Sequence, residues 1–248
     1  MNEDFISAII PAAGMSSRMN IDKNKNFLCI AKRPVLSYSI SVFCLCQQVR
    51  EIILVHKPED IEEIENAVAI ARPNKPIKMV LGGKTRQESV YNGLRETDPN
   101  SRYAAIHDAA RPFVTQKIIA ECIESAKIHD AACAAVKAKD TCVLANRSMI
   151  ESSLNRDLLY LLQTPQIFSK DLILYAHEAA IQDCVEATDD TTLVKRLGHM
   201  VALTEGSYDN IKLTTYDDLL FAELIMQNKK NMEDSNVYRQ SDDRTNFL

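Results

Sequence analysis

Short, continuously apolar stretches alternate with longer segments of helical periodicity through residue 136 of this chain. Strands that are apolar throughout, rather than at every second position, are typical of a parallel sheet covered by helices on both faces. The pattern therefore predicts an α/β fold built on a mostly parallel sheet. The predicted strands are 7–13, 51–56, 77–81, 103–106 and 131–136, and the predicted helices are 34–46, 58–71, 89–95 and 116–128.

The loops that follow these strands are where we expect a binding site. Ligands of open α/β sheets bind in the crevice beyond the carboxyl ends of the strands. Functional side chains are therefore expected in the loops that follow Ala13, Leu81, Ile106 and Val136.

The regular alternation ends at about Lys139. The next thirty or so residues contain short strand-like pieces and no long helix, which is typical of a functional excursion or a dimerisation arm. Regular structure then returns, and it is predicted as a helix at 191–197, a strand at 200–204 and a closing helix at 216–226.

The end of the chain differs in composition from the rest. From Gln227 onward it is polar and aperiodic, with the sequence QNKKNMEDSNVYRQSDDRTNFL. Such a segment does not carry enough apolar surface to pack against a core. We therefore predict one domain over 1–226 and a flexible tail over 227–248.

Composition narrows the class of protein. The chain has 248 residues, 46% of them hydrophobic, and a formal net charge of −5, which argues against a general nucleic-acid binder. No apolar run approaches the roughly 20 residues of a membrane span, and the acidic start MNEDFISAII does not have the layout of a signal peptide. The seven cysteines form no C-x-x-C pair, which favours reduced thiols in a cytoplasmic protein.

The loop after the first predicted strand combines small residues with isolated cations. The stretch IIPAAGMSSRMNIDKNKNF runs from a buried strand into Gly14 and then past Arg18 and Lys25. Glycine and alanine let backbone N–H groups approach a ligand closely, and unpaired N–H groups next to cations suit phosphate. The loop therefore predicts a site for a nucleotide triphosphate.

Two common phosphate-binding motifs are excluded. The stretch LGGKTRQ resembles a Walker A motif, but the required first glycine would fall on Lys78. The stretch PAAGMSS supplies one glycine where a dinucleotide-binding fingerprint needs three.

The stretch IHDAARPF carries a carboxylate and an arginine at a strand end. Asp108 is suited to hold Mg²⁺ directly or through water, and Arg111 could fork onto a phosphate. A local Asp–Arg pair that fixes a turn explains the same residues equally well. His107 is interpreted as a packed strand-end residue.

Two later motifs have plain structural interpretations when each is taken alone. In ATDDTTLVKRL, Thr188 or Asp189 would cap a helix, with acidic residues in the first helical turn. In YDNIKLT, Asp209 and Lys212 near a strand end would be a solvated pair.

Taken together, these motifs resemble the 2-C-methyl-D-erythritol 4-phosphate cytidylyltransferases. The resemblance covers about residues 5–225, and ten segments occurring in one order make it highly specific. These segments are PAAG at 11–14, Arg18-Met19, Lys25 with Phe27-Leu28, GG..R..SV.NGL at 82–94, HDAARP at 107–112, KDT at 139–141, Arg156, LQTPQ.F at 162–168, TDD at 188–190 and EGSYDNIKLT at 205–214.

The resemblance implies a Rossmann-like nucleotidyltransferase fold and a homodimer formed through a protruding arm at 139–158. It also implies transfer of a cytidylyl group from CTP to a sugar-alcohol phosphate, release of pyrophosphate and a requirement for Mg²⁺. Cysteine chemistry is not needed, because the substrate phosphate attacks the α-phosphorus directly and catalysis consists of positioning and charge stabilisation.

The roles of individual residues follow from the same resemblance. The implied catalytic residues are Arg18, Lys25 and Lys212; the nucleotide would be bound by Pro11, Ala12, Ala13, Gly14, Gly82, Gly83, Arg86 and Ser89. The substrate would be bound by Asp108, Arg111, Thr141, Arg156 and Thr188, and the metal by Asp108, with Asp209 as a further candidate ligand.

The sequence departs from the family pattern at a few positions. Ser16 stands where glycine is usual, Asn24 and Asn26 flank Lys25 in place of proline and glutamine, and Lys137 and Asp190 replace a common proline and glutamate. Two alternatives remain: a cytidylyltransferase for ribitol 5-phosphate or a related polyol phosphate, and a non-catalytic nucleotide sensor. Retention of the cations argues against the sensor.

Overall fold

The protein is built on one seven-stranded sheet. A computed structural model describes residues 5–14 and 24–242, with side chains described as far as residue 231. Within these residues the strand order is β11-β7-β10-β6-β1-β4-β5. All neighbouring pairs are parallel except those of β10, which runs antiparallel to both β6 and β7. The strands are β1 Ile6–Pro11, β4 Val49–His56, β5 Ile77–Leu81, β6 Tyr103–Ile106, β7 Ala131–Lys137, β10 Tyr160–Ser169 and β11 Ala202–Glu205.

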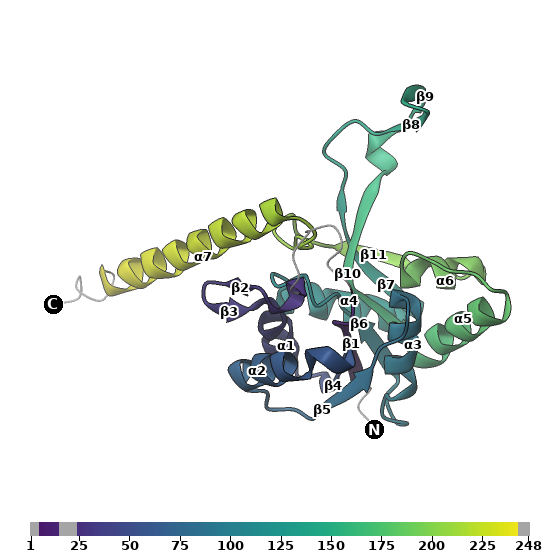
Figure 1. The fold of residues 1–248 in the computed structure, drawn as a ribbon. Coiled ribbons are helices and arrows are strands. Elements are labelled where there is room, and N and C mark those ends of the chain that lie inside the picture. Colours follow the sequence, from purple (N-terminus) through teal and green to yellow (C-terminus); the bar gives the residue numbers. More distant parts are fainter. Residues whose placement is uncertain (1–4, 15–23, 243–248) are drawn as a thin grey trace.

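Helices cover both faces of this sheet, as the sequence predicts (Figure 1). The buried side chains of α1, α2 and α4 form one cluster on one face, and those of α3, α5 and α6 form a second cluster on the other. Strand β1 serves both clusters, because Ala8 and Ile10 belong to the first and Ile9 to the second. The helices are α1 Val35–Leu45, α2 Ile61–Ala71, α3 Arg86–Arg95, α4 Gln116–His129, α5 Lys170–Gln182 and α6 Asp190–Arg196.

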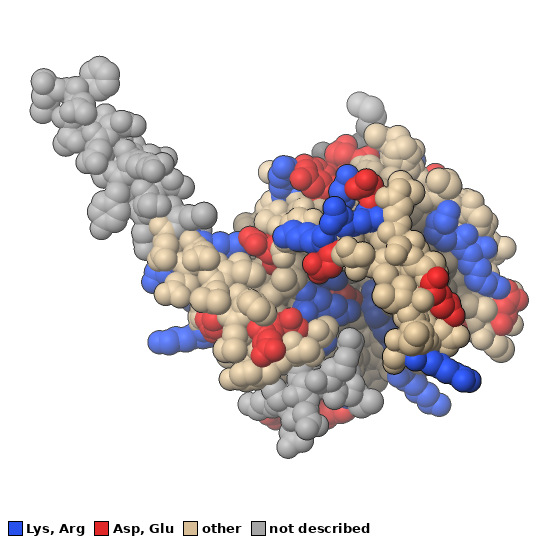
Figure 2. All heavy atoms as spheres, turned by 90° about the horizontal axis from the view of Figure 1, so that it is seen from above, with Lys and Arg blue, Asp and Glu red and all other residues tan. Residues whose placement is uncertain are grey.

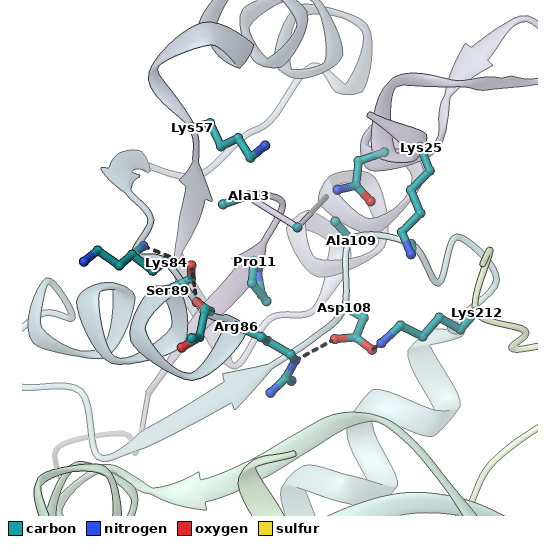
Figure 3. Close-up of a pocket in the computed structure, with 15 residues that line it drawn as sticks. Pro11, Ala13, Lys25, Lys57, Lys84, Arg86, Ser89, Asp108, Ala109 and Lys212 are labelled. Carbon is teal, nitrogen blue, oxygen red and sulfur yellow. Dashed lines mark hydrogen bonds and ion pairs between the residues drawn. The ribbon is translucent and has the colours of Figure 1, made fainter. Parts of the chain in front are cut away.

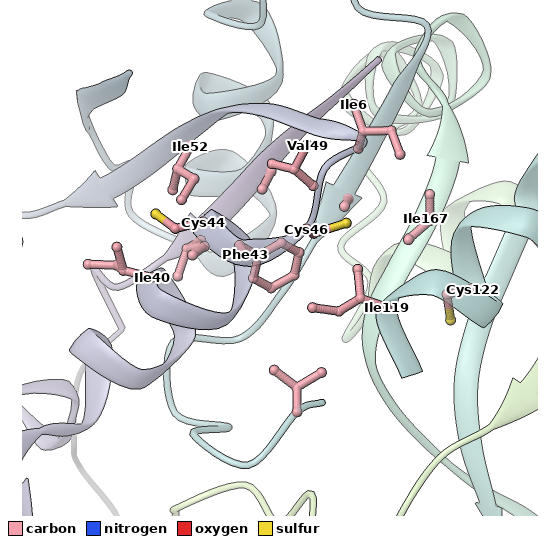
Figure 4. Close-up of a cluster of buried hydrophobic side chains, with 14 of the residues drawn as sticks. Ile6, Ile40, Phe43, Cys44, Cys46, Val49, Ile52, Ile119, Cys122 and Ile167 are labelled. Carbon is pink, nitrogen blue, oxygen red and sulfur yellow. The ribbon is translucent and has the colours of Figure 1, made fainter. Parts of the chain in front are cut away.

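The first cluster is the larger part of the core (Figure 4). Phe43 of α1 and Ile119 of α4 pack there against the inward residues of β1 and β4, and both side chains are fully buried. Burying side chains of this size contributes roughly 1.5–3 kcal/mol each. The sheet is thereby held between its two helical layers.

Helix α3 lies unusually close to the sheet. A Cβ atom on Gly93 would come within 2.8 Å of Ile9 and 2.9 Å of Val55, which is closer than real side chains approach. Thr85 caps the same helix, because its side chain accepts the N–H of Glu88. Close packing and a capped start fix the first turn of α3, which carries Arg86.

Residues 139–158 form a protruding arm. Strands β7 and β10 extend from the sheet into it, and it carries the hairpin of β8 (Val143–Asn146) and β9 (Met149–Ser153) and the 3₁₀ turn η3 (Arg156–Leu158) (Figure 1). The hairpin turns at Arg147 and Ser148, which both have positive φ, as a two-residue type I′ turn requires. The prediction of an α/β fold with a protruding arm is confirmed.

The last helix is longer than predicted. We expected it to end at Met226, but α7 runs over Tyr216–Asp242 and projects away from the body (Figure 1). Residues 227–242 contain neither glycine nor proline, so nothing in their sequence breaks a helix. The described part of this segment, residues 227–231, has no buried side chain, and polarity does not exclude helical backbone. Flexibility of the 227–248 segment stays a prediction.

Four short elements complete the described chain. The hairpin of β2 (Cys29–Ile30) and β3 (Arg33–Pro34) packs beside the first half of α7, and two 3₁₀ turns, η1 (Lys25–Phe27) and η2 (Pro58–Asp60), lie near the ends of β1 and β4. Within the described residues, no helix has the length and apolar composition that a membrane span needs.

Candidate active site

Three of the four loops singled out by the sequence meet at one cavity. It has a volume of about 420 Å³ and lies beyond the carboxyl ends of β1, β5 and β6. On the face seen from above in Figure 2, Lys and Arg side chains gather around a central hollow. The loop after Val136 does not line this cavity. The lining residues are Pro11, Ala13, Gly14, Lys25, Asn26, Lys57, Gly83, Lys84, Thr85, Arg86, Ser89, Asp108, Ala109, Ala110 and Lys212.

Asp108 lies between two cations in this cavity (Figure 3). Lys212 Nζ is 2.8 Å from Asp108 Oδ2, and Arg86 Nε is 3.3 Å from Oδ1. Among the described residues that line the cavity, Asp108 is the only acidic one. Burial by itself raises the pKa of Asp108, but the charges of Arg86 and Lys212 outweigh burial and hold that pKa well below its usual range. The carboxylate is therefore ionised at any physiological pH.

His107 does not line the cavity, but it is linked to Asp108 through the side chain of Thr164. Its Nε2 donates to the carbonyl of Arg111 at 3.1 Å, so its Nδ1 accepts from the Thr164 hydroxyl at 3.0 Å. Thr164 Oγ1 in turn accepts the backbone N–H of Asp108 at 3.0 Å. Burial lowers the pKa of His107 to about 4, so the ring is neutral, as this hydrogen-bond pattern requires. His107 is a packed strand-end residue, as we interpreted it.

Arg111 does not line the cavity, because its guanidinium is hydrogen-bonded to backbone carbonyls. Its Nη1 donates to the carbonyl of Asn210 at 2.7 Å, and its Nε lies 3.8 Å from Asp108 Oδ2. Burial lowers the pKa of this guanidinium, which is 9% exposed. The Asp108–Arg111 motif had two interpretations, a local Asp–Arg pair and a ligand site. The structure contains the local pair, and Asp108 also faces the cavity, where a ligand could meet it.

Two asparagines anchor the segment that carries Lys25. Asn24 Nδ2 and Asn26 Nδ2 both donate to the carbonyl of Ala12, at 3.0 and 2.9 Å. Asn24 Nδ2 also lies 2.9 Å from Asp60 Oδ2, and its Oδ1 accepts the N–H of Asn26. Lys25, between the two asparagines, reaches into the cavity (Figure 3). These departures from the family pattern therefore tie Lys25 directly to the end of β1.

The loop after β5 is held by its own side chains. Ser89 Oγ accepts the N–H of Gly83 at 3.1 Å and donates to the carbonyl of Thr85 at 2.9 Å. A Cβ on Gly82 would meet Ala13 Cβ at 2.7 Å, and one on Gly83 would meet Glu88 Cβ at 2.4 Å. Both glycines are therefore needed where this loop packs against its neighbours.

The predicted site residues fall into three groups. Most of them, including Lys25, Arg86, Asp108 and Lys212, line the cavity, and the buried Ala12 and the partly buried Gly82 lie beside lining residues. Arg18 and Ser16 lie outside the described residues. The remaining predicted residues do not line it: Arg111 is buried, and four residues are exposed, namely Thr141 and Arg156 on the arm, Thr188 before α6, and Asp209 after β11.

Sequence reasoning missed several lining residues. Lys57 follows β4, while Lys84 and Thr85 follow Gly83 in the loop after β5. Their place directly after parallel strands is the signal that could have found them. Ala109 and Ala110 are small residues of the Asp108 loop and give no chemical signal of their own.

A mostly parallel sheet with a cation-rich cavity at the carboxyl ends of its strands is the architecture of the α/β nucleotidyltransferases, and this class fits both the fold and the site. Comparison with known proteins gives the family. The family model described as "IspD: 2-C-methyl-D-erythritol 4-phosphate cytidylyltransferase" matches residues 6–228. The chain therefore belongs to the IspD family.

Curated relatives agree with this membership. Proteins named 2-C-methyl-D-erythritol 4-phosphate cytidylyltransferase are 46% identical in Caldanaerobacter subterraneus and 43% identical in Clostridium novyi. Each alignment covers 90% of this chain, and covers 99% and 97% of the respective relative.

Solved structures agree as well. The crystal structure of 4-diphosphocytidyl-2C-methyl-D-erythritol synthase from Anaerococcus prevotii matches with a TM-score of 0.81 and 32% identity, over 91% of this chain and 100% of that one. The 2-C-methyl-D-erythritol 4-phosphate cytidylyltransferase of Thermus thermophilus matches with a TM-score of 0.74 and 30% identity, over 90% of this chain and 99% of that one.

Proposed function

We propose that this protein transfers the cytidylyl group of CTP to 2-C-methyl-D-erythritol 4-phosphate, giving 4-diphosphocytidyl-2-C-methyl-D-erythritol and pyrophosphate. The observation that carries the proposal is the ionised Asp108 held between Arg86 and Lys212 in a cation-rich cavity. Membership of the IspD family supports the choice of both substrates.

In the proposed reaction the substrate phosphate is the nucleophile. One of its oxygens forms a bond to the α-phosphorus of CTP while the bond from that phosphorus to the bridging oxygen of the β-phosphate breaks, and pyrophosphate leaves. Negative charge builds up around the α-phosphorus, and fixed cations at that position lower the barrier. Lys25 and Lys212, which come from two different loops of the cavity, would supply this charge together with Arg18.

The nucleotide would lie across the loops after β1 and β5. The backbone of Pro11, Ala12, Ala13 and Gly14 would face the triphosphate, and the small residues at Gly82 and Gly83, with Arg86 and Ser89, would surround the cytosine. A tight loop of this kind favours a pyrimidine over the larger purine ring, which supports CTP.

The residues at the cavity fit a Mg²⁺ ion that is held mostly by the nucleotide. Mg²⁺ is commonly bound by one or two carboxylates together with substrate phosphates, and Asp108 supplies one ionised carboxylate. Among the described residues, no cluster of three or more potential ligand side chains forms a complete site within the protein. When bound, the ion would neutralise phosphate charge. Asp209, as a further candidate ligand, is exposed and outside the cavity lining.

The sugar-alcohol phosphate would be bound next to Asp108 by Thr188 and Lys212, and by Thr141 and Arg156 of a partner subunit, while Arg111 would support this site by holding the backbone of Asn210. Two-fold assembly through the 139–158 arm is supported by its apolar surface, since large exposed apolar patches mark interfaces. The exposed apolar residues of the arm and its base are Val143, Leu144, Met149, Ile150, Leu158, Tyr160, Leu161 and Leu162. The seven free thiols support a reducing, cytoplasmic location.

The experiment is a pyrophosphate-release assay with the purified protein. CTP is offered with methylerythritol, ribitol, erythritol and glycerol phosphates in turn, and CTP is then replaced by ATP and GTP. We expect turnover with CTP and methylerythritol phosphate, and loss of turnover in EDTA that Mg²⁺ restores. Preference for ribitol phosphate, equal turnover with ATP, or full activity in EDTA would each contradict the corresponding part of the proposal.

A further inference from the structure

Two neighbouring aspartates at the start of α6 have different structural roles. Asp189 is the N-cap, because its side chain accepts the N–H of Thr192. Asp190 turns inward and is 1% exposed. Its Oδ2 lies 2.8 Å from Arg86 Nη1, and its Oδ1 lies 3.1 Å from His177 Nε2. The adjacent carboxylates therefore face a helix terminus and the candidate active site, respectively.

His177, on α5, is directed at Asp190. A carboxylate oxygen accepts only, so Nε2 of the ring is the donor of this hydrogen bond. The side chain is completely buried, and its Nδ1 has no hydrogen-bond partner in the part of the chain that the structure describes. The ring of Tyr91 stacks against it at 6.0 Å between centroids. Packing and one hydrogen bond thus fix the imidazole, and that hydrogen bond fixes Asp190.

Through Asp190 this buried pair reaches the cavity. Asp190 binds Arg86 by Nη1, Arg86 binds Asp108 by Nε, and Asp108 binds Lys212. Burial alone raises the pKa of Asp190, but the charge of Arg86 outweighs it and lowers that pKa. A chain of ion pairs therefore runs from Asp190 on α6 through Arg86 on α3 to Asp108 and Lys212, and negative and positive side chains alternate along it.

We propose that Asp190 is a positioning residue, which acts through Arg86 to set the place of Asp108 in the cavity. The inference rests on the proposed function, because Asp108 is taken there as the carboxylate beside the reacting phosphates. With Nη1 held by Asp190, Arg86 offers only its Nε to Oδ1 of Asp108. Oδ2 then stays with Lys212.

Without Asp190, the guanidinium is free to turn two parallel N–H groups onto Asp108. Such a bidentate fork is the preferred geometry of an arginine–carboxylate pair. The carboxylate would then be drawn toward α3 and away from Lys212. Small displacements of this kind can cost about 100-fold in rate even when the substituted residue does not touch the substrate.

The test compares two isosteric substitutions at adjacent residues. Asp190→Asn removes the charge that holds Arg86, while Asp189→Asn keeps a side chain that caps a helix equally well. We expect Asp190→Asn to lower kcat about 10- to 100-fold and to raise KM for CTP by a clearly smaller factor, since Arg86 also lies beside the proposed nucleotide site. Asp189→Asn should stay within about twofold of the wild-type kcat. If Asp190 had a purely structural role, Asp190→Asn would instead lower the unfolding midpoint, and kcat would not fall by more than KM rises.

A double-mutant cycle identifies Arg86 as the intermediary. If Asp190 acts through Arg86, then Asp190→Asn should cause no further loss of kcat in the Arg86→Met background. Equal fold-losses in both backgrounds would overturn the inference. So would a kcat for Asp190→Asn within about twofold of wild type.

A second substitution, His177→Gln, tests the inference if the Asp190→Asn protein does not fold. His177→Gln loosens the hold on Asp190 and leaves the Asp190–Arg86 pair, so we expect a smaller loss of about 3- to 10-fold in kcat. An unchanged kcat for a folded His177→Gln protein overturns the inference in that case. Failure of the proposed function is distinguishable, because it is seen in the wild-type protein, which would then release no pyrophosphate.

Discussion

Lys212 Nζ lies 2.8 Å from Asp108 Oδ2, at the point where the loop after β11 passes over the loop after β6. The lysine side chain is 34% exposed, so it faces both the carboxylate and the cavity. A cation in this position compensates the charge of Asp108 and is available to phosphates that enter the cavity. The contact joins two segments that are far apart in the sequence.

Lys212→Gln should therefore lower kcat by about 100-fold or more, the scale of losing one preorganised transition-state contact. The unfolding midpoint should change little, because the side chain is partly solvated. Pyrophosphate release under saturating CTP measures the effect. Lys195→Gln, an exposed lysine on α6, is the matched control and should keep the wild-type rate. A Lys212→Gln protein as fast as this control would remove Lys212 from the mechanism.

Asn26→Ala should weaken both the stability and the activity of the protein. The substitution deletes a buried donor to the carbonyl of Ala12 and leaves Asn24 as the other amide donor on that oxygen. We expect the free energy of unfolding to fall by about 1 kcal/mol. We also expect kcat to fall about tenfold, because the backbone of Lys25 is less fixed. Urea denaturation and pyrophosphate release measure the two effects.

Asn92→Ala provides the comparison for that substitution. Its side chain is more exposed and donates to the carbonyl of Leu81 at 3.1 Å, away from Lys25. This variant should stay within about 0.5 kcal/mol of wild type. If both variants keep full activity, Asn26 has no part in positioning Lys25.

Stability should decrease between pH 7 and pH 5 because of His107. Burial lowers its pKa from the ordinary value of 6.5 to about 4 in the folded protein. In this window the unfolded chain binds a proton that the folded protein does not, so the free energy of unfolding falls as the pH falls. The contribution lost between pH 7 and pH 5 is about 2 kcal/mol.

Urea denaturation at the two pH values measures this decrease, and His107→Gln is the control. The variant has its own stability at pH 7, but its decrease toward pH 5 should be smaller by about 2 kcal/mol. Asp108 does not interfere, since a carboxyl with a depressed pKa loses its stabilising contribution only below pH 4. An equal decrease in both proteins would show that His107 is not the group that titrates.

Mixed dimers test whether Arg156 completes the site of a partner subunit. We expect Lys25→Ala and Arg156→Ala each to lower kcat by about 100-fold or more. Unfolded and refolded together, they should recover activity, because in a mixed dimer one site carries both lesions and the other carries neither. With random pairing, about a quarter of all sites recover. Pyrophosphate release per subunit measures the recovery.

The control for that experiment is each variant refolded alone, which should stay inactive. Mixed dimers are verified by giving one variant a distinguishing mass. If they form and the mixture stays as inactive as its parents, each site uses its own Arg156 and the shared site is rejected.

Much of the fold could be predicted because its signals are local. Five parallel strands and the helices between them were predicted from continuous apolar runs and helical periodicity, and the structure confirms a mostly parallel sheet with helices on both faces. The end of α7 could not be predicted in the same way. Polar composition reports the absence of a buried face, whereas helix propensity decides the backbone conformation.

The sequence by itself determined three of the loops that form the cavity, those after β1, β5 and β6, because parallel strands place their carboxyl ends at one edge of the sheet. Only the tertiary structure decided between chemically equivalent neighbours. Asp189 caps α6 and Asp190 holds Arg86, yet both are aspartates at the start of one helix. Arg111 and Lys212 both approach Asp108, but one is buried on backbone carbonyls and the other lines the cavity. Such differences depend on what each side chain meets across the fold, and contacts between residues far apart in the chain leave no local pattern in the sequence.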